Sequence, residues 1–462
     1  MSSKNKLNRR DFLSKAAVIG AGSALGAEML FNSCSGSGGR TKYTPLHSAS
    51  EIYIPDLPDK AVDGKPIKAA LIGCGARGTG AACNFLDAGN DLLIVACADL
   101  FPDKIDDCRQ LLKKEKGIDI TNEMCFTGFD AYKKVCELPF VDLVIIAPPS
   151  CFHSEFTKYA VSQGKHVFVE KPPAIDPVGY RTFTTAIKQA KEKGLNVITG
   201  AQYHYERPFV ASYKKIQEGY IGKIVSGIVY YNTTNENFIT RKPGWSDMEY
   251  IIRGHFNWNF MNGDQISNML IHWLDIFVWF SCLKPVKVTG FGSRIRRVAG
   301  NVYDNFSMDF EFEDSVHLFG MVRRIDGCDN MQGITIQGDK GVWDSADFSI
   351  RDLNGNLVWQ YDDEAAKKQF KMHDMYTQEH IEMVNYIRQG KVIDIAGTTA
   401  TSAMACIMAR ESAYTGNVCT WEKMIYSDLK MGPDEWNLGK VDLKKIGLLP
   451  LPGIPGKDST VV

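Results

Sequence analysis

The sequence has almost no excess of charge of either sign. Its 53 lysines and arginines nearly cancel its 54 aspartates and glutamates, so the formal net charge is -1. Proteins that bind nucleic acid or an anionic membrane surface through a whole-molecule field need a clear basic excess. The composition therefore argues against a nucleic-acid partner and favours a small neutral ligand.

The sequence also lacks the residue spacing of a metal site. Its 12 cysteines are irregularly spaced, with no CxxC pair and no Cys/His cluster at zinc spacing. Several of them, such as Cys74 and Cys97, lie inside apolar runs typical of strands. We predict that most are buried free thiols and that no metal is bound.

Long hydrophobic runs are missing as well. The apolar stretch 16–31 is broken by glycine and serine and contains Glu28, so it is too short and too polar for a stable transmembrane helix. The remaining composition, 44% hydrophobic and 23% charged, is that of an ordinary globular protein and excludes disordered and collagen-like classes.

An arginine pair near the N-terminus marks a targeting segment. The run 8–15, Asn-Arg-Arg-Asp-Phe-Leu-Ser-Lys, resembles a twin-arginine export signal, which serves proteins that are already folded. We therefore predict a periplasmic location. Because free dinucleotide is not expected outside the cytoplasmic membrane, a cofactor of such a protein must be tightly bound and regenerated on the protein.

Cys34 follows this segment in a context that resembles a degenerate lipid-attachment sequence, Leu-Phe-Asn-Ser-Cys. Phe31 and Asn32 depart from the usual leucine and small residue, so a lipidated and an unmodified Cys34 both stay open. In the lipidated form, the Ser/Gly-rich run 35–39 would act as a flexible leash to the membrane.

The first folded region has the pattern of a dinucleotide site. An apolar run at 66–72 leads directly into a GxGxxG motif, in which the glycines permit a tight turn, close approach of a pyrophosphate and helix packing. A second apolar run ends at Asp99, where a carboxylate can accept hydrogen bonds from ribose hydroxyls. Leu100 and Phe101 stand where a 2′-phosphate binder tends to place arginine, which favours NAD over NADP. The motif glycines are Gly73, Gly75 and Gly78.

Strands and helices alternate up to residue 170, which indicates a doubly wound parallel sheet. Pro148 and His153 follow one strand at the edge where such sheets bind ligands. Further along, β-like runs at 225–231, 286–294, 306–312, 315–322 and 333–337 indicate a mainly antiparallel open sheet, closed by helices at 373–389 and 399–415.

The predicted fold class is α/β, with an N-terminal Rossmann doubly wound parallel sheet and a C-terminal α+β domain with a large, mainly antiparallel open sheet. We expect a signal at 1–34, a linker at 35–65, the Rossmann domain at 66–195, the α+β domain at 196–426 and an extended tail at 427–462.

The chain contains five motifs in this order: GxGxRG, APPSCFH, GKHVFVEKP, GAQYHYERPF and a distal HWLD. With them it resembles the Gfo/Idh/MocA oxidoreductases over about residues 66–425. The resemblance implies that Lys171 is catalytic and contacts the reacting sugar hydroxyl, with Glu170 orienting it or the nicotinamide ribose. An ammonium there can stabilise charge developing on the alcohol oxygen. The resemblance also implies that Arg77, Pro148, His153 and Gln202 contact the cofactor. It further implies a homodimer or homotetramer.

His272 is the second catalytic residue that the resemblance implies. An imidazole with an ordinary pKa of about 6.5 suits proton transfer at neutral pH. The family usually places an acid four residues earlier, but this chain has Asn268 there. Either His272 and Lys171 work alone, or Asp264 or Asp275 supplies the carboxylate. Polar and aromatic residues nearby suit a carbohydrate or polyol substrate. The expected substrate contacts are Lys171, Tyr203, His204, Asn257, Trp258, Asn268 and His272.

Three functions stay open. The first is an NAD-dependent sugar or polyol dehydrogenase. The second is an NAD-dependent glycoside hydrolase that works through a transient keto-sugar and elimination, although the hydrolases of this kind best known in the family have something other than Glu-Lys-Pro, which this chain keeps. The third is a catalytically silent sugar-binding protein. The dehydrogenase is the leading interpretation because the dinucleotide and catalytic motifs are intact.

Overall fold

The computed structural model describes residues 53–234, 239–297 and 299–442, together with two short paired strands, β16 (Leu449–Pro450) and β17 (Asp458–Ser459). The arginine pair of the predicted signal and Cys34 lie outside these residues. Within the described part of the chain, no helix is long and apolar enough to cross a membrane.

The first sheet is parallel throughout and has the strand order β3-β2-β1-β4-β5-β6. The central strand β4 is apolar along its whole length because helices cover both faces of the sheet; all four of its residues are fully buried. The strands are β1 (Ile67–Ile72), β2 (Leu92–Asp99), β3 (Cys125–Thr127), β4 (Leu143–Ile146), β5 (His166–Val169) and β6 (Val197–Thr199).

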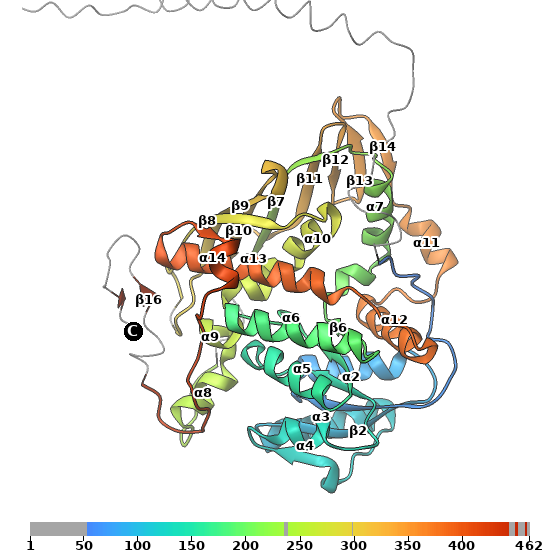
Figure 1. The fold of residues 1–462 in the computed structure, drawn as a ribbon, viewed down its shortest axis with the longest axis vertical. Helices are drawn as coiled ribbons and strands as arrows, with labels where there is room; N and C mark the ends of the chain where they lie inside the picture. The colour runs from blue at the N-terminus through green and yellow to red at the C-terminus, as the bar shows by residue number, and fades with distance from the viewer. Residues whose placement is uncertain (1–52, 235–238, 298, 443–448, 451–457, 460–462) are drawn as a thin grey trace, which may run out of the picture. The chain divides into compact units, whose positions relative to one another are not determined.

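The helices of this sheet agree with the predicted alternation, and the predicted fold class is confirmed (Figure 1). The sequence analysis placed 196–200 at the start of the second domain, but β6 pairs with β5 in the first sheet. It also missed α6, whose Asp176 cap accepts a hydrogen bond from the Gly179 amide at 2.6 Å. The helices are α2 (Ala76–Asp87), α3 (Pro102–Lys116), α4 (Ala131–Cys136), α5 (His153–Ser162) and α6 (Pro177–Glu192).

The second sheet has nine strands in the order β14-β13-β12-β11-β7-β10-β9-β8-β15. Only the β10–β7 pair is parallel, so the predicted mainly antiparallel arrangement is confirmed. The short strands β12 to β14 were missed. The bounds are β7 (Ile224–Thr233), β8 (Pro285–Ser293), β9 (Asn305–Phe312), β10 (His317–Arg324), β11 (Met331–Gly338), β12 (Gly341–Asp344), β13 (Ser349–Asp352), β14 (Leu357–Gln360) and β15 (Cys419–Thr420).

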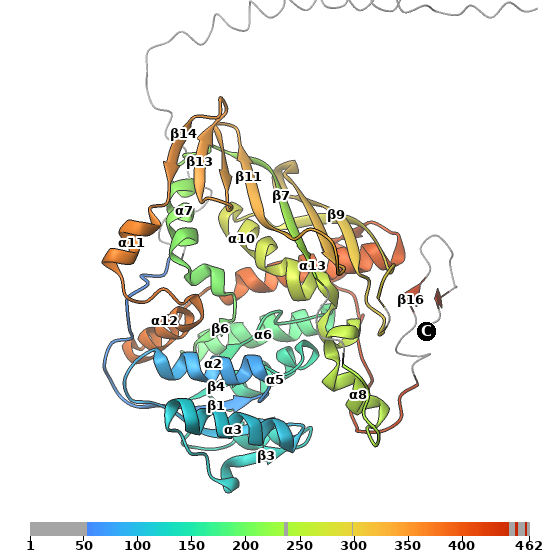
Figure 2. The same ribbon diagram turned by 180° about the vertical axis from the view of Figure 1, so that it is seen from behind.

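Helices join the two sheets. α13 (Ala396–Thr415) packs against β8 and also against α6, so it lies between the second sheet and the first domain (Figure 1, Figure 2). α12 (Met375–Gln389) packs against α2 beside the glycine motif. The other helices are α7 (Arg207–Gln217), α8 (Asp247–Arg253), α9 (Asn259–Asn262), α10 (Ile271–Ser281), α11 (Asp363–Gln369) and α14 (Trp421–Ile425).

Short helical turns connect the longer elements, and three of them contain the predicted site residues Gln202, Tyr203, His204, Asn257 and Asn268. These turns are the 3-10 turns η1 (Asn122–Met124), η2 (Ser150–Phe152), η3 (Gln202–Tyr205), η4 (His255–Asn257) and η6 (Glu313–Ser315), and the π-helical turn η5 (Ile266–Leu270), which leads directly into α10.

Segments outside the sheets pack on the chain itself. In the predicted linker, Leu57 is buried and its amide donates to Glu382 in α12 at 2.8 Å. The described part of the predicted tail, 427–442, runs beside α8, where the Met248 amide donates to the Gly439 carbonyl at 3.2 Å (Figure 2).

Candidate active site

A cavity of about 1210 Å³ opens between the first sheet and the elements that follow it. The loop after β1, the residues after β5, the η5 turn and α10 all contribute to its wall. A site for one drug-sized ligand has a volume of about 300–1,000 Å³. This cavity is therefore large enough for a dinucleotide and a second small molecule.

The glycine motif forms a cradle at one wall of the cavity. Gly73 has a φ of +91°, and a Cβ atom built on Gly78 would lie 1.9 Å from the Gly73 carbonyl oxygen. A Cβ on Gly75 would meet no protein atom within 4 Å, and Gly75 lines the cavity. α2 begins directly after Gly75, so the unbonded amides of its first turn can bind an anion at this wall. The chain thus fits a dinucleotide pyrophosphate here.

Asp99 ends β2 at the same cavity. Its two carboxylate oxygens accept hydrogen bonds from the Cys74 amide at 2.7 Å and the Phe101 amide at 2.9 Å. Burial raises the pKa of Asp99 above its usual value. The carboxylate therefore braces the glycine loop, and its lining position is compatible with the predicted ribose contact, which stays a prediction.

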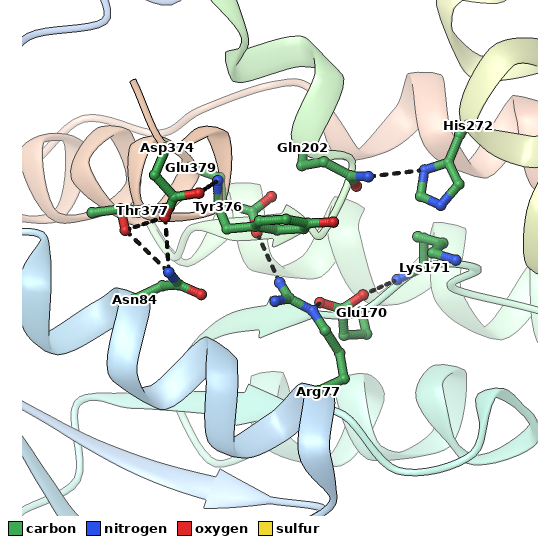
Figure 3. A network of polar contacts seen from close by, with 10 residues as sticks. All are labelled: Arg77, Asn84, Glu170, Lys171, Gln202, His272, Asp374, Tyr376, Thr377 and Glu379. Carbon is green, nitrogen blue, oxygen red and sulfur yellow. Dashed lines mark hydrogen bonds and ion pairs between the residues drawn. The ribbon is translucent and has the colours of Figure 1, made fainter. Parts of the chain in front are cut away.

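Lys171 follows β5 and lies half-buried at the cavity wall (Figure 3). Its Nζ donates to the backbone carbonyl of Asn268 in η5 at 2.6 Å. Burial lowers the pKa of Lys171 to about 8, against the opposing effect of Glu170. An amine with this pKa is neutral in a sizeable fraction of molecules near pH 8 and can accept a proton.

His272 lies on α10 beside Lys171, and both line the cavity. The Gln202 amide nitrogen is 3.2 Å from its Nδ1, so an amide that donates there leaves the imidazole proton on Nε2 (Figure 3). Burial, Lys171 and Arg77 lower the pKa of His272 well below 6.5. The expectation of an ordinary imidazole pKa is therefore wrong, because no anion offsets these effects.

Neither alternative carboxylate reaches His272. Asp275 pairs with His204 at 2.5 Å and accepts from the Ser402 hydroxyl at 2.7 Å. Asp264 accepts from the Tyr414 hydroxyl and from the backbone. The hydrogen bonds of both carboxylates go to other residues, which agrees with the alternative in which His272 and Lys171 work without a carboxylate; the group that contacts the His272 ring is the Gln202 amide.

Glu170 belongs to an ion-pair network that the sequence analysis did not foresee. Arg77 donates to Glu170 at 2.5 Å and to Glu379 of α12 at 3.3 Å (Figure 3). The Tyr376 ring lies 4.5 Å from the Arg77 guanidinium carbon and also lines the cavity. Burial raises the pKa of Glu379 well above its usual value. Arg77 thus fixes Glu170, whose other oxygen accepts from the Lys171 amide at 3.3 Å.

His153 holds two loops of the cavity together. Its Nδ1 lies 2.8 Å from the Pro172 carbonyl oxygen and its Nε2 lies 2.8 Å from that of Pro148. Pro148 and His153 both line the cavity. The geometry assigns the ring nitrogens of His153 to the loops themselves, so its predicted cofactor contact would come from the ring face or edge.

Several predicted substrate residues lie away from this cavity. His204 is fully buried against Asp275 and stacks on Trp279, and Asn257 is buried and accepts from Arg297 at 2.7 Å. Trp258 is buried in an apolar cluster with Phe101 and Phe260. Tyr203 lies beside His272, with ring centroids 5.6 Å apart, and lines a small recess that Lys171 and His272 also line. Of the predicted substrate contacts, Lys171, Asn268 and His272 line the main cavity.

Asn262 and Tyr376 line the cavity and were missed. The Nδ2 atoms of Asn262 and Asn268 are buried and have no protein partner. The Asn-Gly pair at 262–263, just before the His272 helix, was a signal in the sequence for a turn at the site. Tyr376 is remote in sequence and had no such signal. Among the described residues, no group of His, Cys, Asp and Glu has the arrangement of a metal site.

Curated proteins similar to this chain include a glycosyl hydrolase and a dehydrogenase. A glycosyl hydrolase family 109 protein of Bacteroides fragilis is 33% identical over 132 residues, which are 28% of this chain and 27% of that protein. A D-glucoside 3-dehydrogenase of Escherichia coli is 22% identical over 307 residues, which are 65% of this chain and 70% of that protein. The match thus spans only about a quarter of the length of the first of these relatives.

Solved structures share the fold. The structure of scyllo-inositol dehydrogenase from Lactobacillus casei, with bound NAD(H) and scyllo-inositol, matches with a TM-score of 0.59 at 20% identity. The match covers 77% of this chain and 99% of that one. At this identity the likeness shows the common fold.

Two family models match consecutive parts of the chain. The oxidoreductase family model with an NAD-binding Rossmann fold matches residues 67–201, and the GFO/IDH/MocA C-terminal domain model matches residues 209–344. Together these matches account for more than half of the 462 residues. The chain therefore belongs to the Gfo/Idh/MocA family of oxidoreductases.

Proposed function

We propose that this protein oxidises a hydroxyl group of a sugar, glycoside or polyol with NAD bound in the cavity. One observation carries the proposal: an amine with a pKa of about 8, Lys171, lines the same cavity as the glycine cradle and Asp99. A proton acceptor beside a dinucleotide site is what alcohol oxidation requires.

Gly73, Gly75 and Asp99 would hold the dinucleotide, which when bound supplies the hydride acceptor. Neutral Lys171 accepts the proton of the substrate hydroxyl and, in the reverse direction, its ammonium returns it. The Asn268 carbonyl fixes the Nζ atom at 2.6 Å, so proton transfer occurs at a defined point. His272 remains neutral and offers its Nε2–H as a hydrogen-bond donor to the substrate.

The names of similar proteins support the substrate class. They include a D-glucoside 3-dehydrogenase and a scyllo-inositol dehydrogenase with bound inositol. We therefore keep a carbohydrate or polyol as the proposed substrate.

A second candidate is glycoside hydrolysis. Transient oxidation of one hydroxyl acidifies the neighbouring C–H, elimination releases the aglycone, water adds, and reduction restores the hydroxyl. The 33% identity to a glycosyl hydrolase family 109 protein favours this candidate. Both candidates begin with the same oxidation, in which Lys171 takes the hydroxyl proton.

The decisive experiment uses one sample for both candidates. The purified protein is denatured to identify any released dinucleotide, and native protein is incubated with a panel of hexosides while nicotinamide absorbance and aglycone release are followed. Stoichiometric reduction with an accumulating keto-sugar supports the dehydrogenase. Many turnovers of aglycone release without net reduction support the hydrolase. Sugar binding without either signal would instead favour a silent binding protein.

We also propose export by the twin-arginine route, with the cofactor carried along. The arginine pair at 9–10 supports this proposal, and Cys34 is a candidate for a lipid tether. Changing both arginines to lysine should trap the precursor in the cytoplasm. Normal export of that variant would contradict the proposal, and mass spectrometry of the mature N-terminus would decide whether Cys34 is lipidated.

The proposed oligomer uses the second sheet. Phe291 and Met321 both lie opposite Ser307 in the strand register and are 64% and 39% exposed, so they share one uncovered face. Exposed apolar side chains on one face are typical of an interface. Light scattering of the wild type and of a Phe291→Asp variant tests the homodimer or homotetramer.

A further inference from the structure

The end of the cavity at Asp99 has two walls. The first comes from the Rossmann domain and includes Asp99, Phe101 and Phe129. The second comes from residues 239–253, which end with α8, and includes Trp245 and Ile252. A ligand whose ribose lies at Asp99 is therefore covered by a segment that belongs to neither the glycine motif nor the parallel sheet.

An ion pair joins the two walls. The Arg253 guanidinium donates to both carboxylate oxygens of Asp103, at 2.8 and 2.9 Å, and Asp103 lies in the first turn of α3. The same guanidinium lies 3.8 Å from the centroid of the Phe101 ring. A bidentate pair has a fixed geometry and is stronger than a single contact, so Arg253 holds α8 against the edge of the dinucleotide site.

Residues 427–442 form an outer layer over α8. The Met248 amide donates to the Gly439 carbonyl, and the Val441 amide donates to Asp247, both at 3.2 Å. Trp436 then reaches the Rossmann domain, with its ring 4.6 Å from that of Phe152, a residue that lines the cavity. Upstream, the Met431 amide donates to Asp176 at 2.8 Å.

We infer that residues 239–253 and 427–442 form a clasp that completes the dinucleotide site and retains the dinucleotide between turnovers. This inference rests on the proposed function, which places the dinucleotide at Asp99. For the dinucleotide to leave past this wall, the Arg253–Asp103 pair and the Trp436 contact must break first. The clasp therefore slows dissociation without touching Lys171 or His272.

The test is the dissociation rate of NADH from the purified full-length protein. NADH fluorescence is followed after a chase with excess NAD, for the wild type and for Arg253→Ala and Trp436→Ala. We expect each variant to release NADH at least about tenfold faster, which corresponds to about 1.4 kcal/mol. Arg253→Lys should have an intermediate rate, because lysine keeps the charge and loses the bidentate geometry.

Two variants serve as controls. Lys287→Ala removes an ion pair of similar length, 2.6 Å to Glu311, in the second sheet. Tyr426→Ala removes an aromatic ring that is 76% exposed and precedes the outer layer by one residue. Both should release NADH at the wild-type rate. Thermal unfolding identifies any variant that fails to fold, and the other clasp position then carries the test.

The outcomes separate the clasp from the proposed function. Faster release, with turnover restored by added NAD, supports the clasp. If the wild type binds NADH but the clasp variants release it no faster than the control variants, the clasp is overturned. The proposed function then still stands. A wild type that binds no dinucleotide overturns both, and this is visible before any variant is made.

Discussion

The two ends of the cavity are held together differently. At the Lys171 end, the reactive side chains are buried or half-buried and are fixed by hydrogen bonds from the first sheet, η5 and α12. At the Asp99 end, the closing contact is an ion pair whose Asp103 side chain is 54% exposed. A bidentate pair with one half-exposed partner opens more readily than a buried network, which fixes geometry. Loss of chemistry and loss of cofactor should therefore be separable by mutation.

The largest expected effect is at the Lys171 end. Lys171→Ala removes the proposed proton acceptor, and turnover should fall by about 10²- to 10⁴-fold, the usual contribution of general acid–base catalysis. The amount of dinucleotide retained after purification should not change. Lys287→Ala, a lysine of the second sheet, is the control. Near-normal turnover by Lys171→Ala would remove this residue from the mechanism.

At the dinucleotide end of the cavity, Gly75 and Gly78 can be compared by the same substitution to alanine. Gly78→Ala should lower the free energy of unfolding by about 1–3 kcal/mol even without cofactor, because its Cβ overlaps the Gly73 carbonyl. Gly75→Ala should change stability by less than about 0.5 kcal/mol, since no protein atom lies near its Cβ, and should instead weaken NAD binding. Urea unfolding and calorimetric titration measure the two effects. Equal stability of both variants would contradict the geometry.

The pH dependence of turnover tests the protonation states of Lys171 and His272. The pKa of Lys171 is about 8, and the neutral amine accepts the proton, so oxidation should rise with pH and level off above about 8. Between pH 7 and 8 the rise should be about fivefold, because the neutral fraction grows by that amount. The reverse reduction should fall over the same interval. Since the pKa of His272 is well below 6.5, an inflection near 6.5 in both directions would contradict a neutral His272.

Sequence motifs predicted the position of site residues where the chemistry requires a particular backbone conformation. The glycine motif requires a particular turn, so Gly73, Gly75 and Gly78 could be placed from sequence alone. Lys171 was predicted from the family resemblance of the GKHVFVEKP motif, and the structure places it at the cavity wall. The remaining parts of the site depend on which way a side chain points and on contacts between distant segments.

The run 202–205 shows the limit of the sequence. Gln202 points to His272, whereas His204, two residues later in the same turn, points to Asp275 in the core. Both residue types suit a sugar site, and only the turn geometry separates them. Glu379 lies over 200 residues from Glu170, and no local pattern links these two carboxylates to Arg77. The clasp depends in the same way on a remote segment, 427–442.

The smallest expected effect concerns Gln202, a positioning residue. Gln202→Leu removes the amide that contacts Nδ1 of His272 and leaves the shape of the side chain nearly unchanged. One hydrogen bond contributes about 0.5–1.5 kcal/mol, so kcat/KM should fall by about two- to tenfold. Gln163→Leu, at an exposed position on α5's C-terminal end, should have no effect.

A purely structural role for Gln202 would give a different spectroscopic result. Ring ¹⁵N chemical shifts report which imidazole nitrogen is protonated. The wild type should show His272 protonated on Nε2, because Nδ1 accepts the amide proton, and Gln202→Leu should show a mixture of the two tautomers. A lower kcat/KM with an unchanged tautomer would mean that Gln202 acts on the fold of the η3 turn and not on His272. A changed tautomer with unchanged kcat/KM would mean that the Nε2 proton of His272 does not contribute to the reaction.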